Sequence, residues 1–224
     1  MVRILGRANS INVQKVMWLI GELELNHERI DVGLQYGGND TEEYLTKNPN
    51  GLVPTVEDGE TIIWESHSII RYLAEKFGAD TPWWPSDIIS RAHASQWMDW
   101  YGSRLNAPMT TIFWNVVRHP PEKRNPDAVT AAITEAAKLW AILDEELTKK
   151  QFVGGAAPSI SDIPVGCAIH RWSAMDFDKP SFTNVDAWYA RLSSRSPYQT
   201  CLLYTSPSPR DQRGSGVAAW GGKK

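Results

Sequence analysis

One continuous stretch decides the fold of this chain: Val53-Pro54-Thr55-Val56-Glu57-Asp58-Gly59-Glu60-Thr61-Ile62-Ile63-Trp64-Glu65-Ser66. It holds two β-rich runs on either side of Asp58-Gly59, and Asp-Gly between such runs favours the positive φ angles of a tight hairpin turn. Apolar residues then recur at helical spacing from Ser66, and this helix ends at Gly78. The stretch therefore predicts a β-hairpin followed directly by an amphipathic helix.

The residues before this hairpin alternate between strand-like and helix-like patterns. Residues 2–5 and 27–32 predict short strands, and the apolar spacing between them predicts a helix. A second, shorter helix is expected to begin at residues 40–43, whose acidic side chains suit a helix N-terminus. Residues 1–78 therefore predict a small α/β domain with the order βαβ, helix, ββ, helix.

Beyond residue 78 the sequence changes character. Residues 79–86 are rich in Pro and Trp and lack periodicity, which predicts a linker. Residues 87–200 predict an all-α domain, and Ser159-Ile160-Ser161-Asp162 fits a helix-capping signature. From 201 to 224 the apolar periodicity stops, which predicts a non-native or disordered tail. The helices of the second domain are expected over residues 87–118, 126–148, 161–174 and 184–195.

The composition is that of an ordinary soluble protein. With 224 residues, 42% of them hydrophobic and 22% charged, the chain is not collagen-like, mucin-like or wholly disordered. A formal net charge of -3 gives no electrostatic reason to expect a nucleic-acid partner. No targeting signal or membrane-spanning run is evident, so we expect a cytoplasmic protein with no membrane partner. The chain has eleven tryptophans, a side chain that chiefly contributes buried area to a core.

The sequence predicts neither disulfide nor metal chemistry. Its only two cysteines, Cys167 and Cys201, make no disulfide framework, CxxC pair or thiolate zinc site. His93, His119 and His170 have no second ligand at metal-binding spacing, so we expect them to be structural or exposed.

Three short segments of the first domain carry groups that could bind a ligand. Ser10 lies where the first strand meets the first helix, and the free N–H groups of a helix N-terminus favour an anion. A cis bond before Pro54 would turn the backbone of Val53 outward, so that its N–H and C=O could pair with an extended peptide. Glu65-Ser66 lies at the next helix N-terminus. Taken alone, each serine could be an ordinary N-cap.

In their order and spacing these motifs resemble the cytosolic glutathione transferases, particularly the serine-type, theta- or delta-like classes and their bacterial relatives. The resemblance covers roughly residues 2–199. It implies an α+β fold with a thioredoxin-like N-terminal domain and an all-α C-terminal domain, a homodimer, and glutathione as co-substrate without a tightly bound cofactor. The motifs that carry it are Ser10-Ile11-Asn12-Val13-Gln14-Lys15, Asn48-Pro49-Asn50-Gly51, Glu65-Ser66-His67-Ser68-Ile69-Ile70-Arg71-Tyr72-Leu73, the Ser159–Asp162 signature and Asn184-Val185-Asp186-Ala187-Trp188-Tyr189-Ala190-Arg191-Leu192.

The resemblance implies a catalytic role at the start of the first helix. Ser10 matches the serine whose hydroxyl donates a hydrogen bond to the glutathione sulfur and stabilises its thiolate, and Asn12 is a second candidate for that role. A free thiol has a pKa near 8.5, so little thiolate is present at neutral pH. Lowering that pKa by about two units requires roughly 2.7 kcal/mol, which a charge-assisted hydrogen bond and a helix dipole can supply.

The resemblance also implies where the rest of glutathione binds. Val53 would pair by its backbone with the cysteinyl part, and Glu65 and Ser66 would receive the γ-glutamyl end. A basic residue that often meets the glycyl carboxylate is replaced here by Gly51-Leu52, so we expect Lys47 or Asn39 to reach it, or glutathione to bind weakly. The implied glutathione-binding residues are Asn12, Leu52, Val53, Pro54, Glu65 and Ser66.

The second substrate is expected to be a small apolar electrophile, held against Tyr101, Met109 and Trp114 on the first long helix of the second domain. Glutathione conjugation, a detoxifying reaction, is the leading hypothesis, and isomerase or dehalogenase activity would use the same thiolate. The alternative is a non-catalytic member that carries ligands or binds proteins, which Gly51-Leu52 would favour. A thioredoxin-like redox role is set aside, because Ser10 stands where a reactive cysteine would be.

Overall fold

The computed structural model describes residues 1–203, and its first domain is built on a four-stranded sheet. The strand order is β2-β1-β3-β4, with β1 and β2 parallel and the other two pairs antiparallel. The hairpin turn lies at Gly59-Glu60, one residue later than predicted, because Asp58 still pairs with Thr61. The strands are β1 (Val2–Leu5), β2 (His27–Ile30), β3 (Thr55–Asp58) and β4 (Thr61–Trp64).

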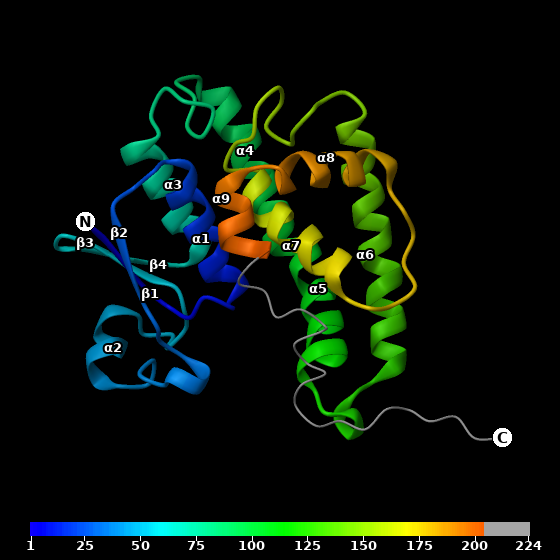
Figure 1. The fold of residues 1–224 in the computed structure, drawn as a ribbon, viewed down its shortest axis with the longest axis horizontal. Helices are drawn as coiled ribbons and strands as arrows, with labels where there is room; N and C mark the ends of the chain where they lie inside the picture. Colours follow the sequence, from blue (N-terminus) through cyan, green and yellow to red (C-terminus); the bar gives the residue numbers. More distant parts are fainter. Residues whose placement is uncertain (204–224) are drawn as a thin grey trace.

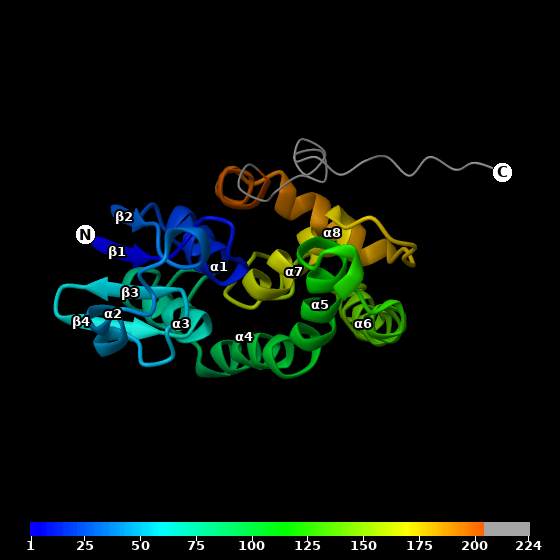
Figure 2. The same cartoon turned by 90° about the horizontal axis from the view of Figure 1, so that it is seen from below.

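Helices α1 (Ile11–Glu22) and α3 (Ser66–Phe77) pack side by side, and α2 (Glu42–Lys47) follows the short turn η1 (Leu34–Tyr36). Helix α1 lies between the sheet and the helical domain (Figures 1 and 2). This arrangement confirms the expected thioredoxin-like first domain. It also places the N-termini of α1 and α3 near each other, which matters for the site.

The second domain is entirely helical, as predicted. Its first long helix is interrupted by one π-helical segment and ends in another, and the residues that join these segments to α4 and α5 keep right-handed helical angles. Pro108 follows the first of these segments; it has no N–H to donate to residue 104, which favours irregular helix there. The elements are α4 (Ile88–Trp100), η2 (Tyr101–Leu105), α5 (Asn106–Phe113), η3 (Trp114–Arg118), η4 (Pro121–Lys123), α6 (Pro126–Leu147), α7 (Asp162–Ala174), α8 (Thr183–Ser193), α9 (Ser196–Tyr198) and η5 (Gln199–Leu203).

Helix α7 forms the centre of the second domain and is buried over most of its length. The buried carboxylate of Asp162, its first residue, accepts the N–H of Ser159 at 2.9 Å, which is half of the predicted capping signature. Gly166 allows α7 to approach α1 closely, because a Cβ there would lie 2.8 Å from the Trp18 ring. The first helix of the sheet domain is thereby fixed against the helical domain.

The packed chain continues past the expected start of the tail. Cys201 and Leu202 are buried, and the thiol of Cys201 donates to the carbonyl of Gln14 at 3.0 Å. The predicted boundary at residue 200 therefore falls inside a packed helical turn, and the rest of the predicted tail, 204–224, lies outside the described residues. Within 1–203, no helix has both the length and the apolar character needed to cross a membrane.

Candidate active site

Ser10 lies at the N-terminus of α1, immediately after the loop that follows β1. Its carbonyl accepts the N–H of Gln14 at 2.9 Å, so its backbone begins the helix, yet its side chain makes no capping hydrogen bond. The residue is largely buried and lines a cavity of about 340 Å³ together with Asn12 and Trp114. The hydroxyl is thus left available to a ligand, at the positive end of the helix dipole.

Asn12 has its side-chain amide oriented by a buried lysine. The ammonium of Lys15 lies 3.0 Å from Asn12 Oδ1 and 3.3 Å from Nε2 of His67 on α3. An ammonium can only donate hydrogen bonds, so the Asn12 oxygen must face Lys15 and the amide N–H groups must point elsewhere. Two N–H donors of Asn12, which is exposed, are therefore left for a ligand beside Ser10.

Lys15 is enclosed by polar and aromatic groups. Its ammonium lies 4.4 Å from the centre of the Tyr101 ring. Burial lowers the pKa of Lys15 to about 7, although the charge of Glu65 opposes this shift. Burial and the neighbouring Lys15 charge lower the pKa of His67 to about 3, which keeps the imidazole neutral and able to accept. The sequence analysis gave Lys15 no role. Its contact with Asn12 could have been expected, because residues three apart on a helix lie on the same face.

The Val53–Pro54 peptide bond is cis. In the part of the chain that the structure describes, neither the N–H nor the C=O of Val53 has a hydrogen-bond partner. Leu52 is 64% exposed, whereas Pro54 is buried and leads into β3. The segment thus presents an unpaired backbone edge beside the sheet, which suits pairing with an extended peptide.

Glu65 and Ser66 lie at the N-terminus of α3. Glu65 has a φ of 70°, a conformation that is costly for a residue other than glycine and is found most often at functional sites. Its side chain is exposed and caps nothing, while Ser66 is buried. The contact between Lys15 and His67 brings this helix end beside the start of α1, so both helix N-termini border the same region.

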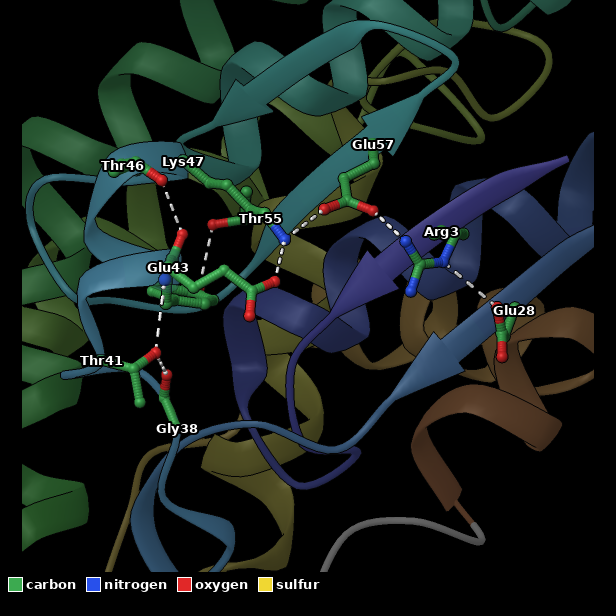
Figure 3. A network of polar contacts seen from close by, with 10 residues as sticks. Arg3, Glu28, Gly38, Thr41, Glu43, Thr46, Lys47, Thr55 and Glu57 are labelled. Atoms are coloured by element: carbon green, nitrogen blue, oxygen red, sulfur yellow. Dashed lines mark hydrogen bonds and ion pairs between the residues drawn. The ribbon is translucent and has the colours of Figure 1, made fainter.

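Both residues expected to reach the glycyl carboxylate are engaged elsewhere. Lys47 lies between two carboxylates, 2.9 Å from Glu43 and 3.0 Å from Glu57 (Figure 3). Asn39 donates its side-chain N–H to the carbonyl of Gly51 at 2.7 Å. Both side chains are therefore oriented by partners within the protein, and each keeps one further N–H beyond these contacts.

The three residues predicted to line the electrophile pocket fall in different places. Trp114 is 46% exposed and lines the cavity with Ser10. Tyr101 and Met109 are only 1% and 4% exposed and are not among the described residues that line it. Tyr101 instead lies beneath Lys15 and donates its hydroxyl to Asn106 at 3.1 Å.

Sequence reasoning missed most of the cavity wall. Apolar side chains from three segments, Ile11, Leu34 and Phe113, line it beside Ser10. Three arginines, at positions 7, 118 and 171, line it as well. Among residues 1–203, no cluster of three or more His, Cys, Asp or Glu side chains could hold a metal ion.

Comparisons with known proteins agree with this architecture. Family models for the glutathione S-transferase N-terminal and C-terminal domains match residues 2–75 and 126–191. The chain is 38% identical over 205 residues to glutathione S-transferase GstB of Escherichia coli strain K12, covering 91% of this chain and 98% of that protein. It is also 29% identical over 199 residues to the disulfide-bond oxidoreductase YfcG of the same strain, covering 86% and 90% of the two chains.

A solved structure extends the likeness to three dimensions. The theta-class glutathione S-transferase of the citrus canker pathogen Xanthomonas axonopodis pv. citri, with glutathione bound, matches with a TM-score of 0.86 and 38% identity. The match covers 90% of this chain and 97% of that one. Sequence, domain content and fold agree, and the chain belongs to the glutathione S-transferase family.

Proposed function

We propose that this glutathione transferase binds glutathione across the N-termini of α1 and α3, with the sulfur beside Ser10 and Asn12. The observation that carries the proposal is the uncommitted Ser10 hydroxyl, which lines a cavity at a helix N-terminus instead of capping the helix. The unpaired backbone of Val53 would hold the cysteinyl part, and the exposed Glu65 carboxylate would meet the γ-glutamyl amine.

The chemistry follows from thiolate stabilisation. The Ser10 hydroxyl and the Asn12 amide donate to the glutathione sulfur, and the positive end of α1 adds to the preference for an anion. The thiol proton passes to solvent, and the thiolate sulfur forms a bond to an electrophilic carbon while the leaving group departs with its electron pair. The enzyme's own residues stay unmodified, because the nucleophile enters with glutathione.

The direct test measures bound glutathione in the full chain. We expect thiolate ultraviolet absorbance at a pH well below the solution pKa of glutathione, together with a calorimetric binding signal. Ser10→Ala should raise the apparent thiol pKa. If Ser10→Ala has no effect and Asn12→Ala abolishes activity, the catalytic role belongs to Asn12. Absence of both binding and thiolate would refute the proposal and favour a ligand carrier.

A second candidate activity is glutathione-dependent disulfide reduction, favoured by the relative named as a disulfide-bond oxidoreductase. Here the same thiolate would attack a disulfide, forming a mixed disulfide with glutathione and releasing one thiol; a second glutathione would then release the other thiol and leave oxidised glutathione, without a reactive protein cysteine. Comparing rates on hydroxyethyl disulfide and on 1-chloro-2,4-dinitrobenzene separates reduction from conjugation.

We also infer that the protein is a homodimer. Large apolar side chains are exposed on the edge strand β4, at Ile62 and Trp64, and at the start of α4, at Ile88 and Ile89. Both segments lie along the lower side of the molecule in Figure 2. Trp64→Glu should shift the sedimentation coefficient to that of a monomer, whereas Ile142→Glu on α6 should not.

The co-substrate also suits a particular location for the protein, which is a reducing compartment rich in glutathione, such as the cytosol.

A further inference from the structure

Three arginines from distant parts of the chain converge on the cavity that contains Ser10. Arg7 follows β1, Arg118 ends η3, and Arg171 lies on α7, yet all three line the same space. Among the described residues that line it, none is acidic. The cavity therefore concentrates positive charge without a compensating carboxylate.

These three side chains differ from most other arginines among residues 1–203 in having no polar partner. Within residues 1–203, none of the three makes an ion pair or a side-chain hydrogen bond, and Nε of Arg7 is buried without a partner. Elsewhere, carboxylates pair with Arg3, Arg29, Arg71 and Arg195, and backbone carbonyls accept from Arg91, Arg124 and Arg191. Among the described arginines, those without a polar partner are thus concentrated at the cavity, apart from the exposed Arg104.

Holding these three positive charges close together is unfavourable. Burial lowers the pKa of Arg171 to about 10, and the neighbouring charges of Arg118 and Arg7 act in the same direction. Unsatisfied buried donors and like charges at short range both cost stability unless an anion neutralises them. A bound anionic group would remove both costs at once.

The surroundings of two of the arginines indicate what kind of molecule carries the anion. The guanidinium carbons of Arg171 and Arg118 lie 4.1 Å and 5.5 Å from the centre of the Phe113 ring. The cavity thus places an apolar aromatic wall directly beside charged donors, with Ser10 bordering the same space. A planar guanidinium matches the two oxygens of a carboxylate especially well.

We propose that the electrophilic substrate of this transferase carries an anionic group, a carboxylate or sulfonate, which Arg118 and Arg171 hold while Phe113 packs against its apolar part. This inference rests on the proposed function and changes one part of it, because sequence reasoning expected an apolar electrophile. The cavity of about 340 Å³ accommodates a small aromatic or aliphatic acid rather than a large conjugate.

Arg7 faces the glutathione side of the cavity. A Cβ placed on Gly33 would lie 3.1 Å from Nη1 of Arg7 and 3.5 Å from Cγ1 of Val53. The guanidinium is therefore close to the segment proposed to hold glutathione. Because glutathione itself has a carboxylate at its glycyl end, the experiment must separate an effect on glutathione from an effect on the electrophile.

The experiment compares 4-chloro-3,5-dinitrobenzoate with its methyl ester in the full-length protein. The two substrates share the reacting carbon and differ by one charge, so each variant is scored by its kcat/KM relative to the unmodified protein for the same substrate. We expect Arg118→Gln and Arg171→Gln to lower kcat/KM for the acid by about 10-fold or more, since each loses a charge-assisted hydrogen bond. The ester should lose much less, and Arg118→Lys should fall between.

Arg104→Gln is the matched control, because Arg104 is exposed on the same long helix and is not among the residues that line the cavity. It should leave both substrates unaffected. If the acid and the ester lose activity equally in the Arg118 and Arg171 variants, the inference is overturned while the proposed function stands. If only the KM for glutathione rises, the arginines serve the tripeptide, and the inference is again overturned. If neither substrate is conjugated and no thiolate forms, the proposed function itself fails.

Discussion

Helices α1 and α7 both begin at serine-containing motifs, and they use their N-termini in opposite ways. At α7, the buried Asp162 carboxylate accepts the N–H groups of Val153, Gly154 and Ser159 and the indole N–H of Trp188, at 2.8–3.1 Å. At α1, the Ser10 hydroxyl makes no capping bond and lines a cavity. The first end is satisfied by the chain itself, and the second is left for a ligand.

The contrast gives a criterion for telling a ligand-binding serine at a helix N-terminus from a capping one, which residue type alone cannot do. Serine at a helix N-terminus is most often a cap, so Ser10 and Ser159 look equivalent in the sequence. They differ only in whether nearby groups already occupy their hydrogen-bonding capacity. Polar groups left unpaired inside a folded protein are costly, and a ligand is a common reason for keeping them.

The largest expected effect is at the N-terminus of α7, where the polar groups are already hydrogen-bonded within the protein. Asp162→Ala removes one carboxylate but leaves the three N–H groups and the Trp188 indole without acceptors, so we expect a loss of about 3–5 kcal/mol in the free energy of unfolding. Urea denaturation followed by circular dichroism measures it. A loss below about 1 kcal/mol would mean that this helix end is not held as the hydrogen bonds indicate.

The next largest effect is expected on activity at the N-terminus of α1, where a substitution should leave stability nearly unchanged. We expect Ser10→Ala to lower kcat/KM by about 10- to 100-fold, which corresponds to roughly 1.4–2.7 kcal/mol of lost thiolate stabilisation. Its unfolding free energy should change by less than about 0.5 kcal/mol, because no capping bond is lost.

Thr41→Ala is the matched control for this prediction. The Thr41 side chain caps α2 by accepting the N–H of Tyr44 at 3.3 Å, so its loss should cost about 1 kcal/mol of stability and leave the thiol pKa unchanged. If Ser10→Ala destabilises the protein as much as Thr41→Ala and leaves the bound thiol unaffected, Ser10 is a cap and the comparison breaks down.

Lys15 provides a pH-dependent test of the same region. Its pKa falls from 10.5 to about 7 on burial, so between these values the unfolded chain carries a proton that the folded chain lacks. Stability therefore rises with pH across this window, by at most about 1.4 kcal/mol per pH unit, and Lys15→Met should flatten that rise. Urea midpoints from pH 7 to 9 measure it. Equal slopes in both proteins would show that Lys15 stays charged.

Much of the fold could be predicted from the sequence, because the turn, helix and capping patterns along the chain were consistent with one another. The hairpin, the helix from Ser66 and the capping carboxylate of Asp162 each depend on residues close together in the chain. Ser10 and Asn12 were proposed as site residues from the family resemblance, which itself depends on short motifs such as the one at this helix end. The turn at Gly59-Glu60 shows the limit, because moving a two-residue turn by one position shifts each cross-strand partner by two residues and keeps the same faces paired.

The cavity wall could not be predicted, for two physical reasons. Arg7, Arg118 and Arg171 meet only through tertiary packing, and no periodicity links them. Tyr101 and Met109 were expected at the wall because the family resemblance places the first long helix of the second domain there, but the segment 101–105 of that helix is π-helical. One extra residue in a turn rotates the following helix face by roughly 100°, so α-helical spacing no longer tells which side chains face the cavity.

The smallest expected effect tests whether a side chain that is already paired within the protein can still help to bind glutathione. Lys47 already contacts Glu43 and Glu57, so the criterion drawn from α1 and α7 places it with the satisfied groups. We expect Lys47→Ala to change the KM for glutathione by less than about 2-fold and to lower stability by about 0.5–1 kcal/mol, as for other ion pairs near the protein surface. Arg7→Gln, measured in parallel, should raise that KM more. A large rise in the KM for glutathione in Lys47→Ala alone would show that glutathione draws Lys47 away from Glu43 and Glu57. A side chain paired within the protein could then not be excluded from the binding site on that ground.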